Sequence, residues 1–404
     1  MDFQHLNYWQ EKANSLQPET RLFINGEYCA AADNSTFETI DPAAQQTLAH
    51  VARGKKADVE RAVQAARSVF DRGDWSQASP ARRKAVLHKF ADLMEAHREE
   101  LALLETLDTG KPIRHSLRDD IPGAARAIRW YAEAIDKVYG EVAPTGVNEL
   151  AMIVREPIGV VAAVVPWNFP LLLACWKLGP ALAAGNSAIL KPSEKSPLSA
   201  LRLAGLAKEA GLPDGVLNVI SGFGHEAGQA LSLHPDVEVI TFTGSTRTGK
   251  QLLKDAGDSN MKRVWLEAGG KSANIVFADC PDLQKAVNAT AGGIFYNQGQ
   301  VCIAGTRLLV EESIADEFLA RLQEQASLWQ PGNPLDPNTT MGCLSITPTP
   351  IAFTALFVPQ RAKAPCCSTG AKTRGRRPLG QPFLSTSIPP RPSAGKRSSA
   401  RYWW

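Results

Sequence analysis

Apolar positions before residue 140 recur every three or four residues, the spacing of helices that bury one face. In the segment 56–71, for example, Val59, Val63 and Phe70 fall on one side. This pattern predicts helices over 56–71, 80–109 and 119–139. Residues 1–55 lack it and predict an irregular arm with short strands, whereas the alternation over 140–157 predicts a two-stranded ribbon outside the main body.

From Ile158 onward, short apolar runs alternate with helical stretches. Strands are predicted over 160–165, 187–190, 215–220, 237–241, 264–266, 273–277 and 306–310. Helices are predicted over 171–184, 197–210, 226–233, 246–256 and 313–328. Strands that are apolar on both faces and alternate with helices indicate an α/β protein with a buried parallel sheet, in which ligands bind beyond the carboxyl ends of the strands.

The pattern breaks after about Leu344, where neither period is sustained. Residues 341–404 carry ten Lys and Arg and no Asp or Glu, so residues 1–340 have 34 basic and 41 acidic side chains, a net charge of −7. A mildly acidic body does not indicate nucleic acid as the main partner. The segment 343–404 resembles a disordered or out-of-frame tail, and the reading in which this basic tail binds nucleic acid rests on ten charges without a fold around them.

Cysteine usage and hydropathy indicate a reduced, cytoplasmic setting. The 404 residues hold seven cysteines, an odd and sparse number with no metal-binding spacing, so no metal is expected. The start of the chain lacks the basic and apolar segments of a signal peptide. The uncharged stretch 158–176 contains Pro166 and Pro170, which predicts two buried elements joined by a turn and no membrane span.

Three polar side chains stand where acyl chemistry would use them. Cys302 lies in a loop between Gly299 and Gly305, and a free cysteine there is either a small packed side chain or a nucleophile that forms a thioester. Glu267 ends an apolar strand before two glycines, so it is either a surface carboxylate or a general base for water. Asn168, held between two prolines, is either a turn residue or an oxyanion donor together with the Cys302 backbone N–H.

Other strand ends carry groups that suit a dinucleotide. Lys191-Pro-Ser193-Glu194 is either a charged turn or a ribose clamp, and its acidic member favours NAD over NADP. Gly224 and Gly228 lie in a loose relative of the dinucleotide glycine pattern. The segment from Phe242 to Lys250 has the glycine and lysine spacing of a phosphate-binding loop, but Gln251 replaces the Mg²⁺-binding hydroxyl, which argues against an NTPase. Gly244 and Ser245 nevertheless begin a helix, whose N-terminus attracts a pyrophosphate.

Five of these motifs occur together in one order, and their combination resembles the NAD(P)-dependent aldehyde dehydrogenase family. They are Pro166-Trp-Asn-Phe-Pro170, Lys191-Pro-Ser-Glu194, Phe242-Thr-Gly-Ser245, Leu266-Glu-Ala-Gly-Gly-Lys271 and Gly299-Gln-Val-Cys302. The likeness runs from about Leu22 to about Gly342, and within the family the chain resembles bacterial enzymes that oxidise gamma-glutamyl-gamma-aminobutyraldehyde in putrescine breakdown.

The resemblance implies a role for each matching position. Cys302 is the expected nucleophile, Glu267 the base and Asn168 the oxyanion donor. The remaining positions are expected to bind NAD, or NADP: Pro166, Trp167, Lys191, Ser193, Glu194, Gly224, Gly228, Phe242, Gly244 and Ser245. The resemblance also implies an aldehyde substrate and a homodimer or homotetramer joined through the ribbon at 140–157.

It further implies a Rossmann-like NAD-binding domain, with the N-terminal arm, over 1–264 and an incomplete catalytic domain over 265–342. The sequence departs from the family at Ala268, where leucine is usual, and after about Gly342 the family's later catalytic strands and its Glu-Ile-Phe-Gly-Pro segment are absent. Two readings of the whole chain follow: an aldehyde-oxidising enzyme with a truncated or frameshifted end, or an inactive fragment that keeps weak nucleotide binding.

Overall fold

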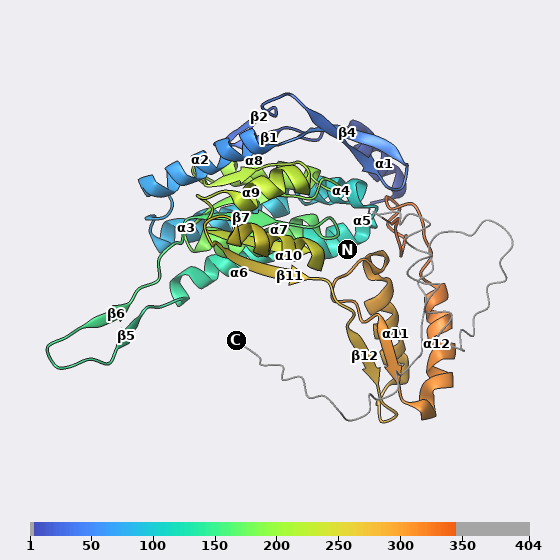
Figure 1. Ribbon diagram of the computed structural model, residues 1–404. Helices are drawn as coiled ribbons and strands as arrows, with labels where there is room; N and C mark the ends of the chain where they lie inside the picture. The colour runs from blue at the N-terminus through green and yellow to red at the C-terminus, as the bar shows by residue number, and fades with distance from the viewer. Residues whose placement is uncertain (1–3, 345–404) are drawn as a thin grey trace.

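A seven-stranded sheet forms the centre of the computed structural model, which describes residues 4–344 (Figure 1). The strands run in the order β11-β10-β7-β8-β9-β1-β2, and the five from β11 to β9 are parallel. Their bounds are β7 Val160–Val164, β8 Ser187–Lys191, β9 Leu217–Val219, β10 Val239–Gly244 and β11 Arg263–Ala268, with β1 Leu22–Ile24 and β2 Glu27–Cys29 added antiparallel at one edge. The predicted α/β class with a parallel sheet is confirmed.

Helices cover both faces of this sheet because successive residues of each strand point to opposite sides. Ala163 and Leu190 pack in a core with one set of helices, whereas Ala162 and Ile189 pack in a second core on the other side. The first set comprises α3 (Pro80–Ala96), α4 (Arg98–Thr109), α6 (Ile121–Ala134), α7 (Pro170–Ala183) and α8 (Leu198–Glu209). The second comprises α2 (Lys56–Arg72), α9 (Gln229–Leu233) and α10 (Thr246–Gly257). The remaining early elements are α1 (Leu6–Ser15), β3 (Thr36–Asp41) and β4 (Gln46–Ala52).

A smaller body follows the sheet and has its own hydrophobic core. It consists of β12 (Ala273–Val276), α11 (Leu283–Phe295), β13 (Arg307–Val310) and α12 (Ala315–Ser327), with short 3₁₀ turns at Tyr296–Gly299 and Glu312–Ile314. The strand predicted over 273–277 is present as β12 but does not belong to the main parallel sheet. This strand pairs in parallel with β13 in a separate two-stranded sheet, because the chain leaves the main sheet through the glycine pair after β11.

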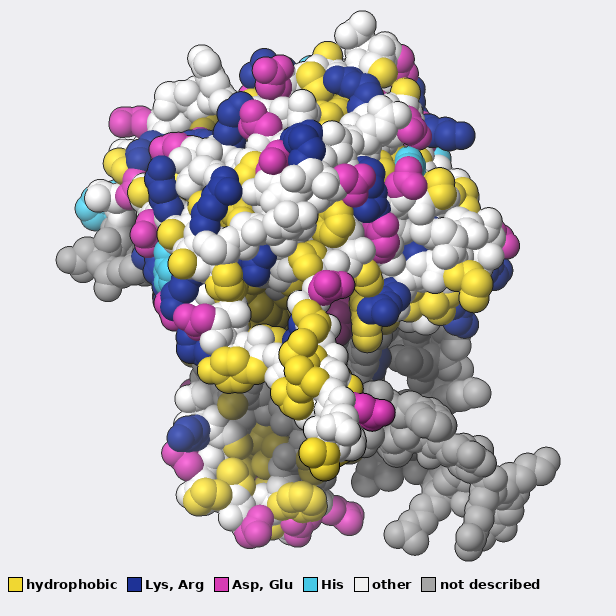
Figure 2. Space-filling view, turned by 90° about the vertical axis from the view of Figure 1, so that its left-hand side faces the viewer, with side chains coloured by type: hydrophobic (Ala, Val, Ile, Leu, Met, Phe, Trp, Pro, Cys, Tyr) yellow, Lys and Arg dark blue, Asp and Glu magenta, His cyan; other side chains and the backbone are white. Residues whose placement is uncertain are grey.

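The predicted ribbon is confirmed as a hairpin of β5 (Glu141–Ala143) and β6 (Ala151–Ile153), which projects away from the body (Figure 1). Val142 and Met152 face each other across its two strands and are 70% and 63% exposed. Figure 2 views the molecule from the side on which the hairpin projects, and it shows hydrophobic side chains on the surface that faces the viewer.

Several predicted helices have different bounds because the chain leaves the α conformation locally. The single helix predicted over 80–109 is two helices, since His97 has φ −98° and ψ 21° between α3 and α4. The helix predicted from Asp119 begins at Ile121, after the short helix α5 (Ile113–His115) and a π-helical turn at Ser116–Asp120, and it ends in a 3₁₀ turn at Ile135–Lys137. The helix predicted over 226–233 is likewise a π-helical turn, Gly224–Gly228, followed by α9.

The tail prediction for 343–404 falls almost wholly on 345–404, which lie outside the described residues. Within the part of the chain that the structure describes, no helix is long and apolar enough to cross a membrane.

Candidate active site

The polar motifs gather at one edge of the sheet because parallel strands end on the same side. The 166–170 turn follows β7, Lys191 ends β8, Gly244 ends β10, and Glu267 lies one residue before the end of β11. Strand register places Thr243 opposite Glu267 and Gly244 opposite Ala268. The predicted cofactor and base residues therefore come from neighbouring strand ends.

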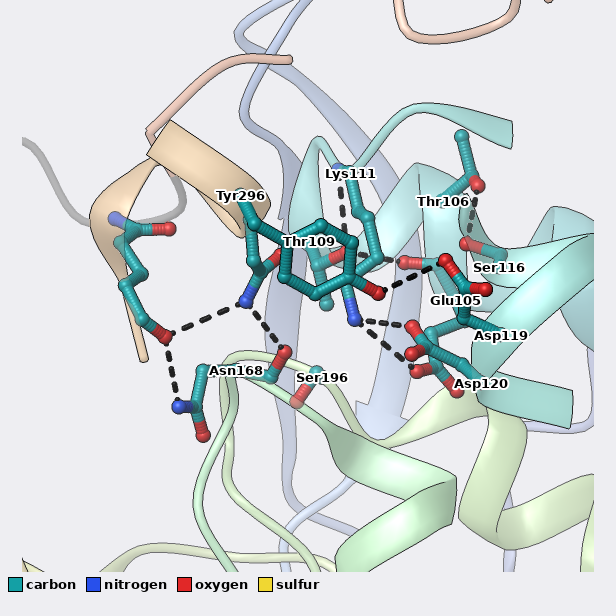
Figure 3. Close-up of polar contacts among 12 residues, drawn as sticks. Glu105, Thr106, Thr109, Lys111, Ser116, Asp119, Asp120, Asn168, Ser196 and Tyr296 are labelled. Atoms are coloured by element: carbon teal, nitrogen blue, oxygen red, sulfur yellow. Dashed lines mark hydrogen bonds and ion pairs between the residues drawn. The ribbon is translucent and has the colours of Figure 1, made fainter. Parts of the chain in front are cut away.

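Asn168 meets the cysteine loop through its side chain. Its Nδ2 donates a hydrogen bond of 2.8 Å to the carbonyl oxygen of Gln300, two residues before Cys302 (Figure 3). Asn297 Nδ2 donates to that same carbonyl at 3.3 Å and to the Asn168 carbonyl at 3.1 Å. An amide carries two N–H donors, so one Asn168 N–H stays available to a ligand. Two segments separated by 132 positions are thus joined at the predicted oxyanion donor.

The cysteine loop owes its shape to three consecutive residues with left-handed backbone, Asn297, Gln298 and Gly299, whose φ angles are 49°, 57° and 72°. This conformation reverses the chain after α11 and leaves Cys302 exposed. The glycine pair after Glu267 lies nearby, since a Cβ placed on Gly270 would sit 3.9 Å from the Cys302 carbonyl oxygen. The segments of all three predicted catalytic residues therefore adjoin.

The described cysteines differ in what they can do chemically. Cys175 is fully buried in α7, and burial raises the pKa of its thiol. A thiol in that setting stays protonated and is unreactive. Among the described cysteines, Cys302 alone is exposed, so a substrate can reach its side chain.

Lys177, which the sequence patterns did not single out, lies close enough to Glu267 for the two charges to interact. Its ammonium lies on the buried side of α7, 8% exposed, and donates to Thr241 Oγ1 on β10 at 3.2 Å. Burial lowers the pKa of Lys177 to about 8, while the charge of Glu267 opposes that shift. A single lysine in the apolar helix Pro170–Ala183 was the available sequence signal, because such a charge is placed in a core only with a partner.

Removing this buried ammonium is expected to change the pH dependence of folding. The folded-state pKa of Lys177, about 8, lies below the ordinary lysine value of 10.5, so between these pH values the unfolded chain binds more protons. The wild-type protein therefore gains stability as pH rises through this window. Lys177→Met should therefore have a higher free energy of unfolding than wild type at low pH. Its gain over wild type should be about 2 kcal/mol larger at pH 7 than at pH 10. Chemical denaturation at both pH values measures this.

The exposed Lys254 serves as the control, because Lys254→Met should show the same difference from wild type at both pH values. An equal effect of pH on the two variants would contradict a lowered Lys177 pKa.

The residues predicted to hold a dinucleotide supply the donors and the space that it needs. The Lys191 ammonium is buried, donates to the Pro192 carbonyl at 2.8 Å and lies 3.7 Å from the Glu194 carboxylate. Burial lowers the pKa of Lys191, and Glu194 opposes this. The pair presents an ammonium and a carboxylate at a strand end, the chemistry that binds ribose hydroxyls. Ser193 between them is buried, and its Oγ accepts from Lys195 N–H at 3.3 Å.

The N-terminus of α10 offers the anion site that the sequence predicts. Ser245 caps the helix, its Oγ accepting from Thr248 N–H at 3.1 Å, and the first turn is exposed. Phe242 is buried, and its ring would lie 2.5 Å from a Cβ at Gly244, so only glycine fits at that strand end. Nothing lies within 4 Å of a Cβ placed on Gly224 or Gly228. This open space and the exposed helix end fit a pyrophosphate.

The 166–170 turn completes the set. Pro166 and Trp167 are half-buried, and the Trp167 carbonyl accepts from Ser196 Oγ at 3.3 Å. This bond ties the turn to the loop that follows Lys191, which brings the backbone at positions 166 and 167 close to the predicted ribose clamp.

Comparison with known proteins agrees with this geometry. The aldehyde dehydrogenase family matches residues 28–349. The NADP/NAD-dependent aldehyde dehydrogenase PuuC of Escherichia coli K12 is 82% identical over 344 residues, which are 85% of this chain and 70% of PuuC. The aminoacetaldehyde dehydrogenase of Pseudomonas aeruginosa is 47% identical, over 82% of this chain and 67% of its own length.

Solved structures agree as well. A cysteine-to-alanine mutant of the P. syringae indole-3-acetaldehyde dehydrogenase AldA, in complex with NAD⁺ and IAA, has a TM-score of 0.85 and 59% identity. The gamma-glutamyl-gamma-aminobutyraldehyde dehydrogenase of Burkholderia cenocepacia has a TM-score of 0.84 and 55% identity. Each alignment covers 85% of this chain and 70% of the other. The chain belongs to the aldehyde dehydrogenase family, whose members are NAD(P)-dependent oxidoreductases.

Proposed function

We propose that the chain oxidises gamma-glutamyl-gamma-aminobutyraldehyde to its carboxylic acid with NAD or NADP, as a step of putrescine catabolism in the cytoplasm. The observation that carries the reaction is the Asn168–Gln300 hydrogen bond, which joins an amide donor to the backbone of the exposed cysteine loop. The substrate follows from the Burkholderia relative named for it, together with the 82% identity to PuuC. The inactive-fragment reading is not favoured by these relatives.

In this proposal Cys302 is the nucleophile. Its thiolate attacks the aldehyde carbon, and a carbon–sulfur bond forms while the carbonyl oxygen takes the negative charge. The second N–H of Asn168 and the Cys302 backbone N–H then donate to this oxyanion. Fixed donors of this kind are worth roughly 3 kcal/mol each of barrier, because they need no reorganisation when charge develops.

Hydrolysis of the resulting thioester falls to Glu267. A bound NAD or NADP would supply the hydride acceptor: as the oxyanion re-forms its C=O bond, the hydride leaves the former aldehyde carbon and the thioester on Cys302 remains. The Glu267 carboxylate then takes a proton from water, and the hydroxide attacks the thioester carbon and releases the acid from Cys302. Glu267 is exposed on β11, so it can exchange that proton with solvent.

The cofactor residues keep the roles that the sequence predicts. Lys191 and Glu194 hold ribose hydroxyls, with Ser193 and the Pro166–Trp167 backbone beside them. Gly244 and Ser245 form the pyrophosphate site, and Gly224, Gly228 and Phe242 bind the cofactor as well.

A comparison of two aldehydes tests the substrate. We expect kcat/KM for gamma-glutamyl-gamma-aminobutyraldehyde to exceed that for 4-acetamidobutyraldehyde by about tenfold or more. Both share the amide and the four-carbon aldehyde, and only the first carries the glutamyl ammonium and carboxylate. NADH formation measured by absorbance gives both rates. Equal rates would reject the proposed substrate but leave aldehyde oxidation as the activity. No turnover of either aldehyde would reject aldehyde oxidation itself.

We also propose that the β5–β6 hairpin joins subunits in a homodimer or homotetramer. Val142, Met152 and Val154 expose 63–70% of their surface on an arm that extends from the body, and exposed apolar clusters of this kind mark protein contacts. The paired substitutions Val142→Lys and Met152→Lys should lower the mass measured by analytical ultracentrifugation. The Tyr139→Lys control, just before the hairpin, should leave the mass unchanged. An unchanged mass in the paired variant would reject this interface.

The boundary between the two proposed domains needs one adjustment. The predicted break between 264 and 265 falls inside β11, which pairs residue by residue with β10. We therefore propose that the NAD-binding domain extends to Ala268 and that the partial catalytic domain begins at the glycine pair.

A further inference from the structure

One turn touches both halves of the proposed active site. Gly110 ends α4 with φ 72°, and the chain then enters the buried turn at Lys111. The Gly110 carbonyl accepts from Gln298 Nε2 at 3.0 Å, four residues before Cys302. The Lys111 ammonium lies 4.1 Å from the centre of the Phe169 ring, and Phe169 follows Asn168 directly. The nucleophile loop and the oxyanion turn therefore rest on adjacent residues.

The Lys111 side chain carries a charge where the protein excludes water. It is 0% exposed and forms an ion pair with Asp120, and its Nζ lies 3.7 Å from Glu105 Oε1 (Figure 3). Burial raises the pKa of Glu105 to about 8 and also raises that of Asp120. A buried ion cluster is seldom the most stable filling of a core, because removing the charges from water costs more than hydrophobic packing would. Stability alone is a weak reason for this lysine.

The Phe169 ring is the element that the ammonium can hold in place. A cation over an aromatic face is attracted by the ring quadrupole, and the attraction is larger when the cation is desolvated. The Tyr296 ring also stacks with Phe169, at 6.4 Å between centroids and an interplanar angle of 20°. Tyr296 in turn donates from its hydroxyl to Asp119 at 3.2 Å, next to Asp120. Phe169 thus contacts both Lys111 and a tyrosine from the segment that leads to Cys302.

We propose that Lys111, held by Glu105 and Asp120, is a positioning residue that sets the Asn168 amide against the cysteine loop. It acts through Phe169 on one side and through the Gly110–Gln298 bond on the other. This inference rests on the proposed roles of Asn168 and Cys302. Displacing a reacting group by about 1 Å can lower a rate by about 10²-fold. Lys111 can therefore affect the rate through the position of Asn168 even though it does not touch the substrate.

Lys111→Met tests this, because methionine keeps the apolar stem and removes the ammonium. We expect kcat to fall by about 10-fold to 100-fold while the Kd for NAD changes less than about twofold. Hydrogen exchange of the backbone amides should accelerate in the peptides spanning 165–171 and 296–302. The control is Lys262→Met, which removes another buried ammonium, one that donates to the Ser232 carbonyl at 2.7 Å. This control should leave kcat and both peptides unchanged.

A triple variant separates positioning from stability. Glu105→Gln, Lys111→Met and Asp120→Asn together leave no uncompensated buried charge, so folding stability should recover relative to the single variant. We expect kcat to remain low in the triple variant. Recovery of kcat together with stability would overturn the proposal.

Coupling to Asn168 gives the remaining test. If Lys111 acts through Asn168, Lys111→Met should have little further effect on kcat in an Asn168→Ala background. Fully multiplicative effects would overturn the proposal. If the chain turns over no aldehyde, the proposed function fails. The hydrogen-exchange experiment still tests the positioning role of Lys111, and unchanged exchange at 165–171 in Lys111→Met would reject that role.

Discussion

Cys302→Ala is expected to abolish aldehyde oxidation and leave NAD binding intact. The substitution removes the sulfur that bonds to the aldehyde carbon, and no thioester can form without it. Loss of a covalent nucleophile lowers kcat by about 10⁴-fold or more, which corresponds to about 5 kcal/mol of barrier. Cys302 is exposed on its loop, so the loss of its sulfur should not disturb the fold. Steady-state NADH formation and a titration with NAD measure the two effects.

The control for this experiment is Cys29→Ala, at a half-buried cysteine on β2 at the far edge of the sheet. It removes one thiol without touching the cysteine loop, and kcat should stay within about twofold of wild type. Turnover that persists in the Cys302 variant would refute the nucleophile. A loss of NAD affinity as large as the loss of kcat would instead indicate that the loop had collapsed.

The parallel sheet was predictable because its strands are buried on both faces and therefore read as continuous apolar runs. The strand ends at Lys191 and Gly244 followed from the same pattern. The separate pairing of β12 with β13 was not predictable from periodicity, because a strand's partner depends on the path of the chain after Gly269 and Gly270. The break at His97 was also hidden, since histidine is an ordinary helix residue and no proline or glycine marks the position.

The candidate site shows a similar division. Cys302, Glu267 and Asn168 stand in motifs that are legible along the chain, with glycines or prolines around each. Lys177 and Lys111 are not, because their importance lies in contacts across long separations, to Thr241 and to Phe169. A lone lysine in an apolar helix is a weak signal on its own. The role of such a residue follows from the side chains that it contacts in the folded protein, more than from its neighbours in the sequence.

Glu267→Gln should separate the two halves of the reaction. The amide cannot accept a proton from water, so the thioester on Cys302 should form and then persist. We expect one equivalent of NADH per active site in a rapid burst, followed by turnover slower than wild type by about 10²-fold to 10⁴-fold. Stopped-flow absorbance gives the burst, and mass spectrometry of the quenched protein should find the acyl group on the peptide that contains Cys302.

The double variant Glu267→Gln with Cys302→Ala is the matched control, and it should show neither burst nor adduct. A Glu267→Gln variant that turns over without a burst at the wild-type rate would remove Glu267 from the mechanism. If the Glu267→Gln variant shows neither a burst nor turnover, the step that it has lost comes before thioester formation. In that case the carboxylate would act on the Cys302 thiol, because a thiol must lose its proton to become the nucleophile. The two outcomes distinguish a base for water from a base for sulfur at one position on β11.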